Sequence, residues 1–120
     1  MASPFVHLHN HSQFSLLDGA QKIDDMVDKA SSLGMKSVAI TDHGNLFGAI
    51  KFYKKALKKG IRPVIGVEAY VALGDRRERH SVPGQKKPYY HLVLLAENYT
   101  GYRNLIRLVL QGYREGFYYK

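Results

Sequence analysis

Short apolar segments alternate with longer segments of helical periodicity along the first part of the chain, and this alternation constrains the fold more than any other feature. The pattern predicts strands at residues 5–9, 37–41 and 63–73, and helices at residues 23–34 and 45–60. Residues 37–41 are apolar on both faces, which is typical of a strand buried in a parallel sheet. Strands and helices that alternate with short connections form βαβ units, so the sequence predicts an α/β fold.

The pattern changes after residue 73. Residues 74–88 are charged, contain proline and glycine and have no apolar period, so we expect a long loop there. Residues 89–98 then predict a fourth strand, and residues 99–116 predict a third helix. The apolar side chains expected to face inward from this third helix are Tyr102, Leu105, Ile106, Val109 and Tyr113.

The helix expected at residues 45–60 is amphipathic. Asn45 suits its N-cap position, because an asparagine side chain can accept a hydrogen bond from a free backbone N–H of the first turn. Lysines occupy one face of the helix. The apolar side chains of its other face are Leu46, Ile50, Tyr53 and Leu57.

The composition limits the class of protein. The chain has 120 residues, of which 45% are hydrophobic and 23% charged, as is ordinary for one globular domain. It has no apolar run long enough to cross a membrane and no leader segment, so we expect a cytoplasmic protein. It also has no cysteine, so a metal held by these residues must be bound by histidine and carboxylate. The net charge of +8 suits a polyanionic partner or a solvated basic surface equally well.

Three histidines stand at alternate positions near the start of the chain. His7, His9 and His11 lie in and directly after the strand expected at residues 5–9. Alternate side chains of a strand point to one face, and imidazole is the commonest metal ligand, so this spacing favours a metal site. His7 would lie deeper than His9, and we expect it to be a buried, hydrogen-bonded support for the ligands.

Further groups that can bind a metal follow the other predicted strands. Asp18 lies in the loop after the first strand, Asp42 and His43 follow the second, and Glu68 lies within the third. Because ligand sites form where the carboxyl ends of parallel strands meet, we expect these side chains to converge. Such nitrogen and oxygen donors suit Zn²⁺, Mn²⁺ or Fe²⁺, and Glu68 could bridge two ions roughly 3.5 to 4 Å apart. Asp18 could instead cap the following helix.

Four segments together resemble a known family: FVHLHNHSQFSLLDGA, VAITDHGNLFGAIKFYKKA, PVIGVEAYV and YHLVLLAENYTGYRNL. In this order and spacing they resemble the N-terminal PHP (polymerase and histidinol phosphatase) domain of bacterial DNA polymerase III alpha subunits. The resemblance implies a distorted (βα)7 TIM-like barrel with divalent metal ions at one mouth. It also implies, for some members, a metal-dependent 3′–5′ exonuclease activity.

The resemblance assigns a role to each matching position of this sequence. The metal ligands that it implies are His9, His11, Asp18, His43, Glu68 and His91. Of these, Asp18 and Glu68 would take part in catalysis through the metals. The side chains expected to support the ligands are His7, Ser12 and Asp42.

His91 raises a question of topology, because it begins its apolar segment whereas the other ligands end theirs. In a simple parallel barrel it would face the opposite mouth. Two alternatives stay open: the segments around residues 68 and 91 run antiparallel as an open hairpin, or the fourth strand begins earlier.

The length of the chain limits how much of this family's fold it can contain. A barrel of this kind needs on the order of 200 residues or more, so we expect residues 1–120 to be the N-terminal part of a PHP domain, with its loop at 74–88. The 120 residues alone are expected to be inactive. Apolar side chains left uncovered would favour association between copies.

The resemblance also implies the function of the parent protein. That protein would be a DNA-directed DNA polymerase, a nucleotidyltransferase of DNA replication, and its complete PHP domain would be a metal-dependent phosphoesterase. Its partners would be DNA and other replicase subunits, including a proofreading exonuclease. Zn²⁺ is the metal we expect, with Mn²⁺ or Mg²⁺ as alternatives. Two other functions stay open: a non-catalytic module that docks the proofreading subunit, and a stand-alone PHP phosphatase.

Overall fold

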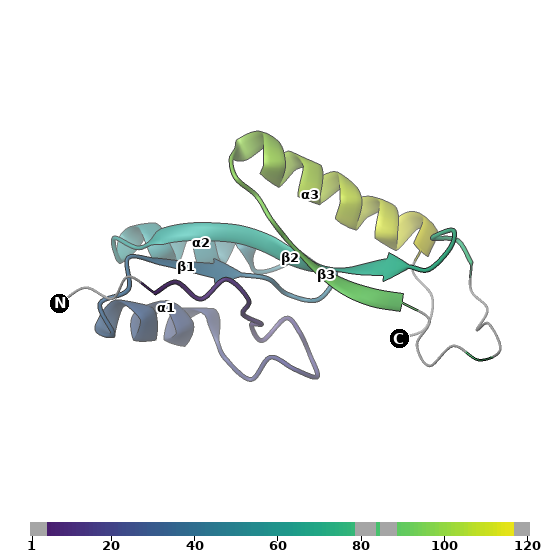
Figure 1. The fold of residues 1–120 in the computed structure, drawn as a ribbon. Helices are drawn as coiled ribbons and strands as arrows, with labels where there is room; N and C mark the ends of the chain where they lie inside the picture. Colours follow the sequence, from purple (N-terminus) through teal and green to yellow (C-terminus); the bar gives the residue numbers. More distant parts are fainter. Residues whose placement is uncertain (1–4, 79–83, 85–88, 117–120) are drawn as a thin grey trace.

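Each apolar period of the sequence corresponds to one element of the fold, apart from the first predicted strand. The computed structural model describes residues 5–78, 84 and 89–116. Their order along the chain is α1 (Ile23–Ser32), β1 (Ser37–Ile40), α2 (Ala49–Lys58), β2 (Arg62–Ala72), β3 (Tyr89–Leu95), α3 (Tyr99–Gln111) and the π-helical turn η1 (Gly112–Gly116). The first two helices pack against each other beside β1, and α3 lies over the β2–β3 hairpin (Figure 1).

The sheet is mixed, with the strand order β1-β2-β3. β1 pairs parallel with β2, with Ile40 opposite Ile65, and α2 connects the two strands as a βαβ unit. β2 pairs antiparallel with β3, and this register places Tyr70 opposite His91. The open-hairpin alternative for the segments around residues 68 and 91 is therefore confirmed.

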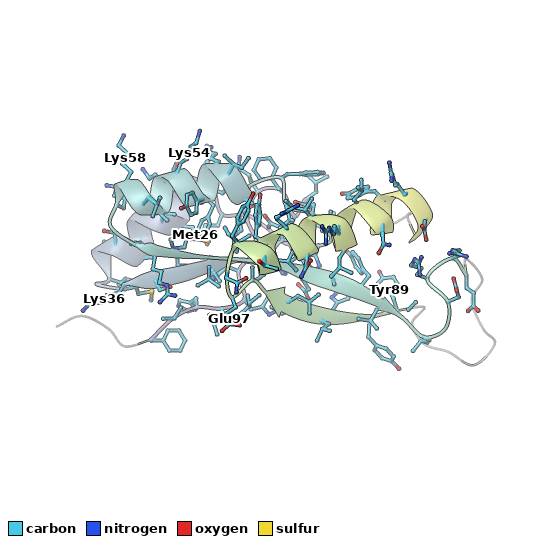
Figure 2. The ribbon with its side chains drawn as sticks, turned by 90° about the horizontal axis from the view of Figure 1, so that it is seen from above. Met26, Lys36, Lys54, Lys58, Tyr89 and Glu97 are labelled. Carbon is cyan, nitrogen blue, oxygen red and sulfur yellow. The ribbon has the colours of Figure 1, made fainter. Side chains whose placement is uncertain are left out.

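The core lies between the first two helices and the sheet. Phe52 of α2 is fully buried, and burial of one such side chain stabilises the fold by roughly 1.5 to 3 kcal/mol. The other buried members of this core are Ile23, Met26, Val27, Ala30, Val38, Ile40, Ala56 and Ile61. Figure 2 labels Met26 in this region and shows Lys54 and Lys58 pointing away from the sheet.

Helix α2 begins later than the sequence pattern predicts. Its first residue is Ala49 and its N-cap is Gly48, which has no side chain to form a capping hydrogen bond. Asn45 is not the N-cap: its side-chain oxygen accepts a hydrogen bond from the backbone N–H of Phe47 at 3.1 Å, within the preceding turn. The expected cap was wrong because an asparagine bond to the residue two positions on also forms turns.

Helix α2 also buries a different face from the one expected. Its buried residues are Ala49, Phe52 and Ala56. The apolar side chains of Ile50, Tyr53 and Leu57 are instead about half exposed or more. Two alanines flank Phe52 on the inner face and allow the helix backbone to approach α1 and the sheet closely, whereas Ile50, Tyr53 and Leu57 lie on the outer face.

Residues 5–11 run beside β1 but do not form the strand expected at residues 5–9. The backbone N–H of Ala39 donates to the carbonyl of His7 at 3.0 Å, and Thr41 donates to Asn10 at 2.8 Å. The Asn10 side chain donates to the Ala39 carbonyl at 3.0 Å and so interrupts a regular ladder. His7 is consequently exposed, with its ring 4.7 Å from that of Phe5, so the expectation that it is buried was wrong.

Helix α3 begins at a side-chain cap. The carboxamide oxygen of Asn98 accepts a hydrogen bond from the backbone N–H of Gly101 at 2.9 Å. Of the residues expected to face inward, Leu105 is buried. Ile106 and Tyr113 each expose more than two fifths of their surface to solvent. Among the described residues, none of the helices has the length and apolar character that crossing a membrane requires. Most of the loop expected at 74–88 lies outside the described residues, at 79–83 and 85–88.

Candidate metal centre

Glu68 is placed by the way β2 extends past the end of β1. Its backbone N–H donates to the carbonyl of Asp42 at 2.9 Å, and its own carbonyl accepts from Gly44 at 3.0 Å. These two bonds hold the turn after β1 directly against the middle of β2. Gly44 has a φ of 59°, a left-handed conformation that glycine adopts without strain. The turn therefore carries His43 to the side of the Glu68 carboxylate.

Four imidazoles surround the Glu68 carboxylate. His11 Nε2 is 2.5 Å and His9 Nε2 is 2.9 Å from Glu68 Oε2. His91 Nδ1 is 3.0 Å from the other oxygen, Oε1, because the hairpin places its strand beside β2. His43 Nδ1 is 3.4 Å from Oε2. Segments separated by more than eighty residues of sequence thus converge on one buried carboxylate.

His43 joins this group to Asp18. Its Nε2 is 2.7 Å from Asp18 Oδ2, and an N–H at that nitrogen leaves Nδ1 with a free lone pair. Nδ1 is buried and has no hydrogen-bond partner within the described part of the chain. A lone pair that faces a carboxylate oxygen across 3.4 Å is an arrangement that a cation between them would satisfy.

The spacing of the donor atoms fits a metal. Three groups have donor atoms that all lie within 4.8 Å of one another, and these are His9 with His11 and Glu68, His11 with Asp18 and His43, and His43 with Glu68 and His91. Two ligands bound at about 2.1 Å in tetrahedral geometry would lie about 3.4 Å apart. The residues present therefore fit divalent ions, and Glu68 belongs to two of the three groups.

The charge of the centre is fixed by the same contacts. Burial raises the pKa of Glu68. The hydrogen bonds from His9, His11 and His91 lower it by a larger amount, so the pKa falls to about 2. Glu68 is therefore ionised at neutral pH. An ionised carboxylate is the form that a divalent cation requires of a carboxylate ligand.

A second buried carboxylate lies behind the ligands and ties their two loops together. Asp42 accepts hydrogen bonds from the backbone N–H of Ser12 at 2.6 Å, from the Ser12 hydroxyl at 2.6 Å and from the Ser15 hydroxyl at 2.8 Å. Ser15 Oγ in turn accepts from the backbone N–H of His43 at 3.0 Å. The loop that carries His11 is thereby held against the turn that carries His43.

The loop between Ser12 and α1 folds back tightly to bring Asp18 to His43. The backbone N–H groups of Asp18 and Gly19 both donate to the carbonyl of Ser15, at 3.1 and 2.7 Å. A Cβ atom added to Gly19 would lie 1.7 Å from the Ser12 carbonyl oxygen, so only glycine fits there. Asp18 does not cap α1, whose N-cap is Lys22. That alternative interpretation of Asp18 was wrong.

The structure brings together all six side chains that the sequence singled out as ligands, namely His9, His11, Asp18, His43, Glu68 and His91. It places Ser12 and Asp42 behind them and leaves His7 outside the cluster. Sequence reasoning missed Ser15 and the interrupting role of Asn10. Asn10 could have been suspected from its place between two metal-competent histidines, whereas no spacing marks Ser15.

Comparison with known proteins supplies the family. The model of the PHP domain family matches residues 7–120. The DNA polymerase III subunit alpha of Borreliella burgdorferi is 54% identical over 118 residues, which cover 98% of this chain and 10% of that protein. That of Thermus aquaticus is 52% identical, covering 97% of this chain and 10% of that protein. The chain therefore spans about a tenth of the length of these curated relatives.

Solved structures share the fold. An amidohydrolase from Chromobacterium violaceum matches with a TM-score of 0.59 and 27% identity, over 90% of this chain and 34% of that one. A protein from Bifidobacterium adolescentis, described as a metal-dependent phosphoesterase, matches with a TM-score of 0.59 and 19% identity, over 89% of this chain and 34% of that one. Since the family model covers nearly every residue, the chain belongs to the PHP domain family.

Proposed function

We propose that this chain is the PHP region of a bacterial DNA polymerase III alpha subunit and that the complete region hydrolyses phosphodiester bonds at the 3′ end of DNA. The convergence of four imidazoles and two carboxylates at the end of β1 and the middle of β2 carries the proposal. The identity to polymerase subunits of two organisms supports the choice of parent protein. Residues 1–120 form the N-terminal part of a distorted (βα)7 barrel.

The six clustered side chains hold the metal ions in this proposal. When bound, the ions supply Lewis acidity toward water and toward the phosphoryl oxygens. The four imidazoles among the six donors favour Zn²⁺, with Mn²⁺ or Mg²⁺ as alternatives. Glu68 would serve more than one ion, because its Oε2 faces His9 and His11 whereas its Oε1 faces His91.

The chain's own residues then position these donors. Asp18 orients the His43 ring through Nε2 and so leaves Nδ1 directed at Glu68. Asp42 keeps the loop of His11 and the turn of His43 at a fixed separation before any ion arrives. Preorganisation of this kind lowers the cost of binding, since the ligands do not have to be ordered afterwards.

The remaining features of the parent protein belong to the same proposal. It acts in the cytoplasm on DNA, together with other replicase subunits that include a proofreading exonuclease. The 120 residues alone are inactive, because the ion shells need ligands from the rest of the barrel. In isolation they associate through exposed apolar side chains such as those of Ile50 and Leu57.

The test uses the full-length subunit and a single-stranded oligonucleotide labelled at its 5′ end, without nucleoside triphosphates, so that polymerisation cannot occur. Hydrolysis from the 3′ end is measured with Zn²⁺ or Mn²⁺ for the wild type, His9→Ala and Glu68→Gln. His7→Ala is the matched control, because His7 is an exposed histidine two residues from His9 and outside the cluster.

We expect hydrolysis to fall at least about a hundredfold in His9→Ala and Glu68→Gln and to stay unchanged in His7→Ala. Equal activity of all variants would place the reaction elsewhere and overturn the proposal. No hydrolysis by the wild type, together with weaker binding of the proofreading subunit after metal removal, would instead support the non-catalytic docking module.

A further inference from the structure

Aromatic rings lie directly beside the candidate metal centre. Tyr70 follows Glu68 by two residues on β2 and is opposite His91 on β3, so it shares their face of the hairpin. Its ring stacks on that of His43 at a centroid distance of 6.1 Å, and meets the His91 ring edge-on at 5.1 Å. Tyr89 adds a further ring, stacked on His91 at 5.6 Å. These contacts form one wall of the centre.

A second, more exposed pair of rings is formed by Phe47, in the turn that follows β1, and Tyr113, in η1. Phe47 follows His43 by four residues, and Asn45 holds the turn between them through its bonds to the Phe47 N–H and the His43 carbonyl. The Phe47 ring lies 6.3 Å from that of Tyr113 in η1. Phe47 is 66% exposed and Tyr113 is 44% exposed. The two rings therefore lie at the surface, one short turn away from a candidate ligand.

Tyr113 is brought to this place by an ion pair. The end of α3, from which η1 follows, returns to the far end of β2 (Figure 1). There Arg76 donates two hydrogen bonds to the Glu115 carboxylate, at 2.9 and 2.5 Å.

A nucleobase is the ligand that these observations favour. Aromatic side chains stack on bases without regard to sequence, and each stacked base is worth roughly 1 to 3 kcal/mol. The net charge of +8 suits a polyanion better than an apolar peptide, and the neighbouring centre would take the phosphate. We infer that Phe47 and Tyr113 form a stacking platform for a base at the single-stranded 3′ end; this rests on the proposed function.

The experiment compares two oligonucleotides as substrates of the full-length subunit. One has a normal 3′-terminal residue and the other has an abasic 3′-terminal residue. The variants are Phe47→Leu and Tyr113→Leu, which keep an apolar side chain and remove the ring. Tyr99→Leu is the matched control, because Tyr99 is 73% exposed at the start of α3. Phe47→Tyr and Tyr113→Phe keep the ring and test whether any loss is due to stacking.

We expect the wild type to hydrolyse the normal end about fivefold or more faster than the abasic end, in kcat/KM. Phe47→Leu and Tyr113→Leu should bring this ratio close to one without slowing hydrolysis of the abasic end. The two ring-keeping variants and Tyr99→Leu should keep the wild-type ratio. An unchanged ratio in both leucine variants would overturn the inference. If these variants also had lowered thermal stability, the result would show that the rings pack against another part of the protein.

A second readout separates this inference from the proposed function. An oligonucleotide with 2-aminopurine as its 3′-terminal base and a phosphorothioate terminal linkage reports stacking as fluorescence quenching, without hydrolysis. If the wild type hydrolyses neither end, the proposed function fails. The stacking platform then stands if Phe47→Leu and Tyr113→Leu reduce the quenching, and it is overturned if they do not.

Discussion

The buried carboxylate of Asp42 is expected to be the main link between the two loops that carry His11 and His43. Its side chain is 2% exposed and accepts three hydrogen bonds, two from Ser12 and one from Ser15. Asp42→Ala removes all three and leaves the Ser12 backbone N–H buried without its acceptor. A loss of stability is therefore expected without any direct change to a ligand.

The size of the effect follows from these bonds. A hydrogen bond to a charged group contributes about 1.5 to 3 kcal/mol, so three of them set a ceiling of roughly 4.5 to 9 kcal/mol. The variant no longer has to bury a carboxylate, and the two hydroxyls can turn to other acceptors, which offsets part of the loss. We expect a net decrease of about 3 kcal/mol in the free energy of unfolding. Asp42→Asn keeps one acceptor oxygen and should cost about 1 kcal/mol.

Urea unfolding of the 120-residue chain, followed by far-UV circular dichroism at one fixed protein concentration for every variant, measures this difference. At a slope of about 1.5 kcal/mol per molar urea, a loss of 3 kcal/mol lowers the midpoint by about 2 M. Asp25→Ala is the control, since Asp25 is an exposed acid of the first turn of α1. If Asp42→Ala shifts the midpoint no further than Asp25→Ala does, the proposed link between the loops is wrong.

Two further predictions concern Glu68 on β2 and Gly19 in the loop before α1. The pKa of Glu68 is lowered to about 2, so its carboxylate stabilises the metal-free fold above pH 4.5, and this contribution disappears as the pH falls toward 2. The difference in thermal midpoint between wild type and Glu68→Gln should therefore be largest above pH 4.5 and close near pH 2; a constant difference would contradict this origin of the shift. Gly19→Ala would place a Cβ atom 1.7 Å from the Ser12 carbonyl, so thermal unfolding should show a loss of about 2 kcal/mol or more. Gly112→Ala, where the added Cβ meets no atom within 4 Å, should be neutral, and equal effects of both would refute the steric reason.

The sequence predicts those parts of the fold that depend on periodicity. The strand at residues 37–41 and the helix at residues 23–34 were placed within two residues of β1 and α1, because buried apolar side chains recur there at regular spacing. The convergence of His43 and Glu68 was also predictable. His43 directly follows the strand predicted at residues 37–41, and Glu68 lies within the neighbouring strand predicted at residues 63–73. The positions of these two ligands on neighbouring strands were enough to predict that they meet.

Other features depended on contacts that no local pattern encodes. The face of α2 that is buried was decided by how closely Ala49 and Ala56 can approach neighbouring elements, which the amphipathic pattern does not state. The strand expected at residues 5–9 is absent because the Asn10 side chain takes the Ala39 carbonyl, a long-range hydrogen bond. Ser15 belongs to the site only because its loop folds back onto Asp42.

The central claim is that His11 and Glu68 help to hold a divalent ion, and titration calorimetry of the metal-free chain with Zn²⁺ tests it most directly. The wild type should bind Zn²⁺ weakly, because the complete ion shells need ligands from the rest of the barrel, and His11→Ala and Glu68→Gln should bind it about tenfold to a hundredfold more weakly still. His7→Ala should bind as the wild type does, because its imidazole is outside the cluster. Equal Zn²⁺ affinities for His11→Ala, Glu68→Gln and the wild type would contradict the account.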